Sequence, residues 1–152
     1  MQTLEQQLAE LEQFIPLMEK GKSKISIVPI AWHLDHSLRV INSIVKALEE
    51  SDPNQFKSNF NYWRSLFLTL NFLPRGKGRA PKRVLPEGKI SESDLRSKLS
   101  LAKEKTLELE NLPASAHFPH PMFGELHKIQ AQKFIRIHTE HHLKICRDIT
   151  NS

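Results

Sequence analysis

The sequence has only one cysteine, Cys146, among its 152 residues, and this excludes an internal disulfide framework. It has no run of about eighteen or more apolar residues, so we expect no membrane-spanning helix. Its first residues lack the basic and then apolar pattern of a signal peptide. We therefore expect a cytoplasmic protein with one domain, residues 1–152. Cys146 is interpreted as a small buried apolar residue, with a ligand or nucleophile as the alternative.

Glycine is scarce as well, and three of the five glycines lie between residues 74 and 90. Elsewhere, apolar residues recur three and four positions apart, which predicts amphipathic helices, and no stretch alternates convincingly as a strand would. The predicted helices span roughly residues 3–20, 27–50, 53–72, 91–111 and 125–149. This pattern predicts an all-α protein, a four-helix bundle with one extra helical segment.

The predicted helix 53–72 carries an aromatic face. Phe56, Phe60, Trp63 and Phe67 recur at spacings of four, three and four. Such a face is typical of a helix that packs into the core, and we favour that interpretation over a ligand-binding face.

Histidines, in contrast, are frequent, and the last predicted helix carries His138, His141 and His142. His138 and His142 are four residues apart, so their rings share one helical face and are spaced to reach one metal ion. The segment is not a zincin motif, because Thr139 stands where the catalytic glutamate would be. Core or surface histidines are the alternative, and a metal site needs a third ligand from elsewhere.

The predicted helix 27–50 offers two histidines as that third ligand. His33 lies beside the apolar stripe, on a flank that also holds Val40 and Ile44. His36 lies on the side of Arg39, which we interpret as the solvated face. Helical geometry therefore favours His33 over His36.

Residues 74–90 form a predicted loop with three prolines and strong positive charge. One interpretation is a solvated mobile loop, and a second is a lid that binds an anionic group of a small-molecule substrate. Nucleic-acid binding is a third, but no aromatic residue is interleaved for base stacking. The candidate anion-binding residues are Arg75, Lys77, Arg79, Lys82 and Arg83.

Three segments together resemble the DinB/YfiT-like metalloenzyme superfamily: Trp-His-Leu-Asp-His-Ser at 32–37, His-Pro-Met-Phe-Gly at 120–124 and His-Thr-Glu-His-His at 138–142. The second segment and the basic loop resemble one uncharacterised branch of it. The resemblance implies an up-down-down-up four-helix bundle, often a homodimer. It also implies zinc or nickel held by three histidines, which match His33, His138 and His142. Many members have glutamine where this chain has Ile145, so no role of that glutamine is transferred.

The resemblance implies a metal-dependent enzyme that activates a water or a low-molecular-weight thiol, as a hydrolase or a thiol transferase. His141 is the candidate for acid–base catalysis. Glu140 and Asp35 are disfavoured, because their helical positions point away from the expected metal. The alternative is a non-catalytic, metal-binding dimeric bundle of a stress-response or binding type.

Overall fold

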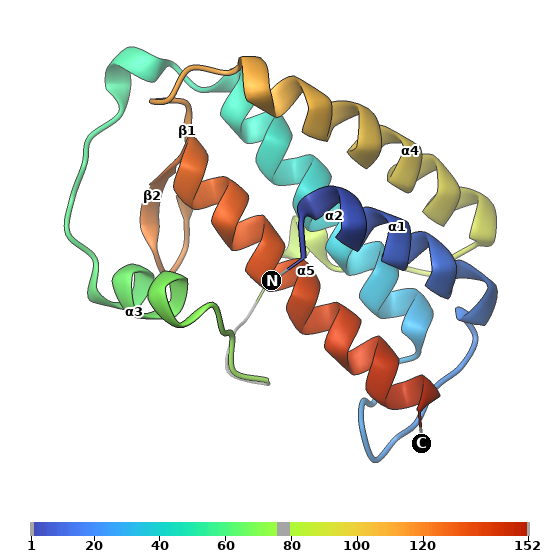
Figure 1. Cartoon of the computed structure of the whole chain (residues 1–152). Coiled ribbons are helices and arrows are strands. Elements are labelled where there is room, and N and C mark those ends of the chain that lie inside the picture. The colour runs from blue at the N-terminus through green and yellow to red at the C-terminus, as the bar shows by residue number, and fades with distance from the viewer. Residues whose placement is uncertain (1, 76–79, 152) are drawn as a thin grey trace.

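The computed structural model describes residues 2–75 and 80–151, and it is mostly helical with one small sheet (Figure 1). The helices are α1 (Leu4–Phe14), α2 (Ile30–Glu50), α3 (Tyr62–Leu70), α4 (Glu92–Glu108) and α5 (Lys128–Thr150). The 3₁₀ segments are η1 (Ile15–Leu17), η2 (Pro53–Gln55), η3 (Lys82–Val84) and η4 (Leu109–Asn111). The strands are β1 (His117–His120) and β2 (Gly124–His127).

The first helix begins where the sequence predicts and ends earlier. Thr3 Oγ1 accepts a hydrogen bond from the Gln6 N–H, and Gln6 Oε1 accepts one from the Thr3 N–H, which is a capping box. The α-helix ends at Phe14, and Pro16 lies in η1, since proline lacks the N–H that would continue the helix. The observed α-helix is therefore shorter than the predicted helix 3–20.

Helices α1, α2, α4 and α5 pack around a shared apolar core, and α2 contacts both α4 and α5. In Figure 1, α1 and α5 run in one direction, and α2 and α4 run in the opposite direction. Leu34, Leu38, Ile41 and Val45 of the predicted stripe are buried, and so are the flanks of α2. Because α2 is covered on several sides, side chains outside its apolar stripe are also removed from solvent.

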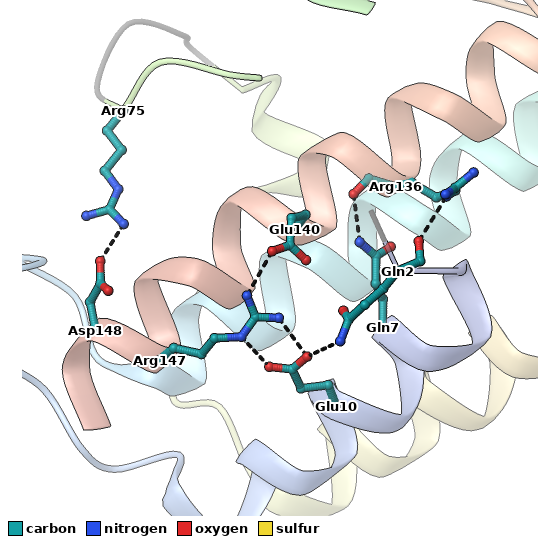
Figure 2. Close-up of polar contacts among 8 residues, drawn as sticks. All are labelled: Gln2, Gln7, Glu10, Arg75, Arg136, Glu140, Arg147 and Asp148. Atoms are coloured by element: carbon teal, nitrogen blue, oxygen red, sulfur yellow. Dashed lines mark hydrogen bonds and ion pairs between the residues drawn. The ribbon is translucent and has the colours of Figure 1, made fainter. Parts of the chain in front are cut away.

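Polar contacts join α1 to one side of α5 (Figure 2). The Arg147 guanidinium donates to both carboxylate oxygens of Glu10, at 2.6 and 2.7 Å, and to Glu140 at 2.8 Å. The hydrogen bonds from Arg147 lower the pKa of Glu10, which also accepts one from Gln2 at 2.9 Å. These contacts leave a different side of α5 to face α2.

The prediction of one continuous helix over residues 53–72 is wrong in its first half. Residues 56–61 are not helical, and only η2 and α3 are. Asn61 caps α3 by accepting a hydrogen bond from the Arg64 N–H at 2.9 Å, which fixes the later start. The aromatic face is also less buried than expected, since Phe60 is 83% exposed and Trp63 is 51% exposed.

The strands correct the all-α prediction. β1 and β2 pair antiparallel, with His120 opposite Gly124. Gly124 has a φ of +67°, in the left-handed region that favours glycine. His120 Nδ1 accepts the N–H groups of Met122 and Phe123, each at 3.2 Å, and so closes the turn. Sequence patterning missed this hairpin because its strands are only four residues long, with three histidines and one proline among their eight residues.

The hairpin also delays the last helix. α5 begins at Lys128 rather than directly after Gly124, and it continues without interruption to Thr150. His117 and His120 are the first and last residues of β1. Within residues 2–75 and 80–151, neither α5 nor any other helix is long and apolar enough to cross a membrane.

Candidate metal centre

Three histidine rings from two helices lie next to one another inside the bundle. α2 contributes His36, and α5 contributes His138 and His142. The ring centroids are 5.0 Å apart for His36 and His138, 4.9 Å for His36 and His142, and 4.7 Å for His138 and His142. One ring nitrogen from each residue lies within 4.8 Å of the other two. The sequence prediction that His138 and His142 share one face toward a partner helix agrees with this arrangement.

The position of His36 corrects the interpretation of α2. His36 is only 3% exposed, so the prediction that it lies on the solvated face is wrong. Its Nδ1 lies 2.7 Å from the Val84 carbonyl oxygen, and its ring stacks on Trp32 with centroids 4.9 Å apart. A single-stripe interpretation of α2 could not foresee this, because η3 covers that side of the helix from a distant part of the chain.

The contact with Val84 also sets the tautomer of His36. A carbonyl oxygen can only accept, so the Nδ1–H of His36 donates to it and Nε2 keeps its lone pair. A histidine that ligates a metal is commonly oriented by such a hydrogen bond from its other ring nitrogen. His36 therefore has the tautomer that a metal ligand needs.

His33 lies beside His142 and also lines the cavity. Its Nδ1 is 3.0 Å from the Nδ1 of His142, and its Nε2 is 2.9 Å from Ser26 Oγ. With His142 Nδ1–H donating to His33 and His33 Nε2–H donating to Ser26, the Nε2 of His142 keeps its lone pair. The ligand role that the resemblance implied for His33 stays a prediction, and the geometry favours His36 in that role.

The three clustered rings are held in their neutral form. Burial is the main cause that lowers the pKa of His36, His138 and His142. Burial likewise lowers the pKa of His33 to about 4. His138 Nδ1 is buried and has no hydrogen-bond partner among residues 2–75 and 80–151. Neutral imidazoles with unused nitrogen lone pairs are the form of histidine that binds transition metals.

The histidines line a cavity of about 500 Å³. Apart from the imidazoles, its walls are mainly apolar and aromatic side chains from α2, the hairpin and α5, such as Val40, Phe118 and Phe134. His141 also lines it, and its Nδ1–H donates to the Leu73 carbonyl at 3.1 Å. A concave, mainly apolar cavity with a few polar groups is typical of a small-molecule site.

The candidate anion-binding residues divide into three groups. Arg75 and Arg83 line the cavity. Lys82 is exposed and is not among the lining residues. Lys77 and Arg79 lie outside the described residues.

The disfavoured acidic residues have structural contacts away from the histidines. Glu140 bonds with Arg147 (Figure 2). Asp35 is buried and forms ion pairs with Arg39 and Lys98, each at 2.6 Å. Cys146 is fully buried, and burial raises its pKa to about 12, which agrees with its interpretation as a small apolar residue.

Sequence reasoning missed three parts of the site. They are His36 as a buried histidine, the Val84 carbonyl that orients it, and the hairpin that walls the cavity. The segment Trp-His-Leu-Asp-His-Ser contained the signal for the first, since it offers two histidines rather than one.

Known proteins add no assignment to this site. No family model, curated protein or solved structure matches the chain. The choice of ligands therefore depends on the geometry of the described residues, and the DinB-like resemblance stays an interpretation of the sequence.

Proposed function

We propose that the chain is a metal-dependent enzyme of the DinB/YfiT-like type, in which His36, His138 and His142 hold a divalent ion such as zinc or nickel. The observation that carries this proposal is the convergence of three ring nitrogens within 4.8 Å at the wall of a cavity. The opposite directions of α1 and α5 relative to α2 and α4 are those of an up-down-down-up bundle, which adds support (Figure 1). His36 takes the place that the sequence hypothesis gave to His33.

Three neutral imidazoles leave a coordination position open for a further ligand, as in catalytic zinc sites. A divalent ion held there would lower the pKa of a water to about 7 or favour the deprotonated form of a thiol. The chain's own groups would orient the reactants. The reaction class is hydrolysis or thiol transfer on a small molecule, and a low-molecular-weight thiol is the proposed co-substrate.

His141 is the residue that we assign to proton transfer. Its Nδ1–H is engaged by the Leu73 carbonyl, so Nε2 has the free lone pair. Burial lowers its pKa, and the hydrogen bond to Leu73 partly opposes that effect. His141 is therefore a neutral base in the cavity at pH 7.

Elemental analysis of untagged protein tests the metal site. Wild-type protein should carry about one divalent ion per chain, and His138→Ala should carry much less, because removal of one of three ligands leaves too few. Equal metal in both proteins would contradict the site. Circular dichroism of the two proteins checks that the loss of metal does not reflect unfolding.

A non-catalytic metal-binding bundle is the second candidate. The cavity favours the enzyme over it, because a purely structural zinc site is closed by four protein ligands. X-ray absorption of zinc-loaded protein distinguishes the two candidates. Coordination positions filled entirely by protein groups would favour the second candidate.

The homodimer that the resemblance implies has a surface that fits it. Exposed apolar side chains gather on and beside α3, which lies outside the four long helices in Figure 1. They are Phe60, Tyr62, Trp63, Leu70 and Phe72, from 51% to 83% exposed. At about 150–250 Å² for a large aromatic side chain, their exposed area is roughly 600 Å². A standard interface buries about 800 Å² on each partner.

The charge of this α3 surface argues for a second copy as its occupant. Between residues 59 and 72 the sequence has one charged residue, Arg64, and it is buried. Arg64 donates to the carbonyl oxygens of Phe123 and Glu125, at 3.2 and 2.8 Å. Two such surfaces can meet around a two-fold axis without like-charge repulsion, although the chain has a net charge of +5.

A further inference from the structure

The charges around the cavity are unbalanced. Two arginines, Arg75 and Arg83, line it, and no aspartate or glutamate is among the described residues that do. The described part of the cavity wall therefore has positive charge and no carboxylate to compensate it.

The two arginines differ in their partners. Arg75 donates to Asp148 at 2.6 Å, so its charge is already paired (Figure 2). Arg83 is exposed, and within residues 2–75 and 80–151 no hydrogen bond or ion pair engages it. Of the two described arginines that line the cavity, Arg83 is therefore the one that remains available to a ligand.

The backbone beside Arg83 is fixed to the histidine cluster. Arg83 lies in η3 next to Val84, which is buried and whose carbonyl accepts the hydrogen bond from His36 at 2.7 Å. The guanidinium therefore belongs to a segment anchored at the proposed metal site. Arg83 and the histidines line the same cavity, so a ligand bound at the histidines also lies in the cavity that Arg83 lines.

The rest of the wall suits an apolar body. Phe118 and Phe123 of the hairpin, Phe134 of α5, and Val40 and Ile44 of α2 line the cavity. Its volume of about 500 Å³ lies within the range of roughly 300–1,000 Å³ for small-molecule sites. Burial of apolar ligand surface against these side chains is favourable.

We propose that this cavity binds an amphipathic anion, an organic molecule with an apolar body against the aromatic wall and one anionic group, such as a carboxylate, paired with Arg83. That this anion is the substrate of the metal site rests on the proposed function, whereas its binding to the cavity does not. A cation is disfavoured because it would add charge of the same sign, and a neutral molecule would leave Arg83 without a partner.

Calorimetric titration of chelator-treated protein with decanoate, decanol and decylamine tests the proposal, below the concentrations at which these compounds aggregate. Decanoate should bind more tightly than the other two. Arg83→Gln should weaken decanoate binding by about tenfold or more, the effect of losing a hydrogen-bonded charge pair. Lys82→Gln is the matched control, since it removes the same charge from an exposed neighbour outside the cavity, and it should leave binding nearly unchanged.

Decanol binding as tightly as decanoate, or equal effects of Arg83→Gln and Lys82→Gln, would overturn the proposal. Repeating the titration after addition of zinc separates it from the proposed function. If the wild-type protein binds no zinc but selects decanoate through Arg83, the metal site fails and the anion site stands. If zinc binds but decanoate is not preferred, the anion site fails and the metal site stands.

Discussion

His33 and His142 face each other through their Nδ1 atoms, 3.0 Å apart, although 109 positions separate them in the sequence. In the tautomer with the proton on Nδ1 of His142, His142 donates to His33 and its Nε2 lone pair stays free, so His33 orients His142. The other ring nitrogen of His33, Nε2, lies 2.9 Å from Ser26 Oγ, so the three side chains form a row of polar contacts.

Substitution of the two histidines of α2 should therefore have unequal effects on metal binding. His36→Phe removes a proposed ligand and should abolish stoichiometric zinc binding. His33→Phe keeps all three proposed ligands but removes the contacts of His33 with His142 and Ser26, and it should weaken zinc binding about 10–100-fold. Competition titration with a chromophoric chelator measures both, and thermal unfolding checks that each variant folds. Tight zinc binding by His36→Phe together with its loss in His33→Phe would restore the assignment made from the sequence.

Acid should destabilise the protein in part through His120. Burial lowers the pKa of His120 to about 4, and its Nδ1 must stay unprotonated to accept the N–H groups of Met122 and Phe123. Between the unfolded pKa of about 6.5 and the folded pKa of about 4, the unfolded chain binds the proton and the folded chain does not. The contribution of neutral His120 to the free energy of unfolding is therefore fully present above pH 6.5 and is lost as the pH falls toward 4.

Urea unfolding of chelator-treated protein between pH 4 and 8 checks this prediction. His120→Asn keeps an acceptor but cannot titrate, so its free energy of unfolding should fall less steeply with decreasing pH. The difference in slope should approach about 1.4 kcal/mol per pH unit, the value for one proton. At pH 8 histidine is neutral in both states, so the comparison there gives the cost of the substitution itself. Parallel curves for the two proteins would contradict the role of His120.

The contacts of Arg147 should contribute to stability more than those of Arg75 (Figure 2). Arg147 bonds to two carboxylates whose side chains are each only 17% exposed, whereas the Arg75–Asp148 pair is about half exposed. Arg147→Ala should lower the free energy of unfolding by about 1–3 kcal/mol. Arg75→Ala should change it by about 0.5 kcal/mol or less, because exposed pairs contribute little.

Equilibrium urea unfolding at pH 7 measures both variants. Arg147 lowers the pKa of Glu10, so part of the stability lost in Arg147→Ala depends on pH. This part should be present above the unfolded carboxylate pKa of about 4.5, and it should be lost as the pH falls through the lower folded pKa. Equal losses for the two variants would show that burial of the carboxylates does not matter.

The α3 surface predicts self-association. Trp63→Lys places a charge at a side chain that is 51% exposed, so it should leave the fold intact and shift a dimer toward monomer. Leu107→Lys is the control, because Leu107 is a 77% exposed apolar residue on α4, away from α3. Sedimentation equilibrium over a range of concentrations measures both. Wild-type protein that stays monomeric throughout would contradict the prediction.

The sequence alone determined the long helices and the inward face of α5. Apolar residues three and four apart specify which face of a helix is buried, and this local periodicity placed His138 and His142 together. The capping box at Thr3 is likewise local, because it involves residues only three positions apart. These features depend on contacts within one helix or on one helical face, so they are readable without knowledge of the partner.

Only the tertiary structure decided which histidine of α2 joins His138 and His142. His36 is buried because η3, from a segment that sequence analysis interpreted as a loop, covers its side of α2 and supplies the Val84 carbonyl. The hairpin that walls the cavity likewise depends on a turn at Gly124 and on pairing of two short strands. Burial of a helix flank is a property of what packs against it, and helical periodicity contains no information about that partner.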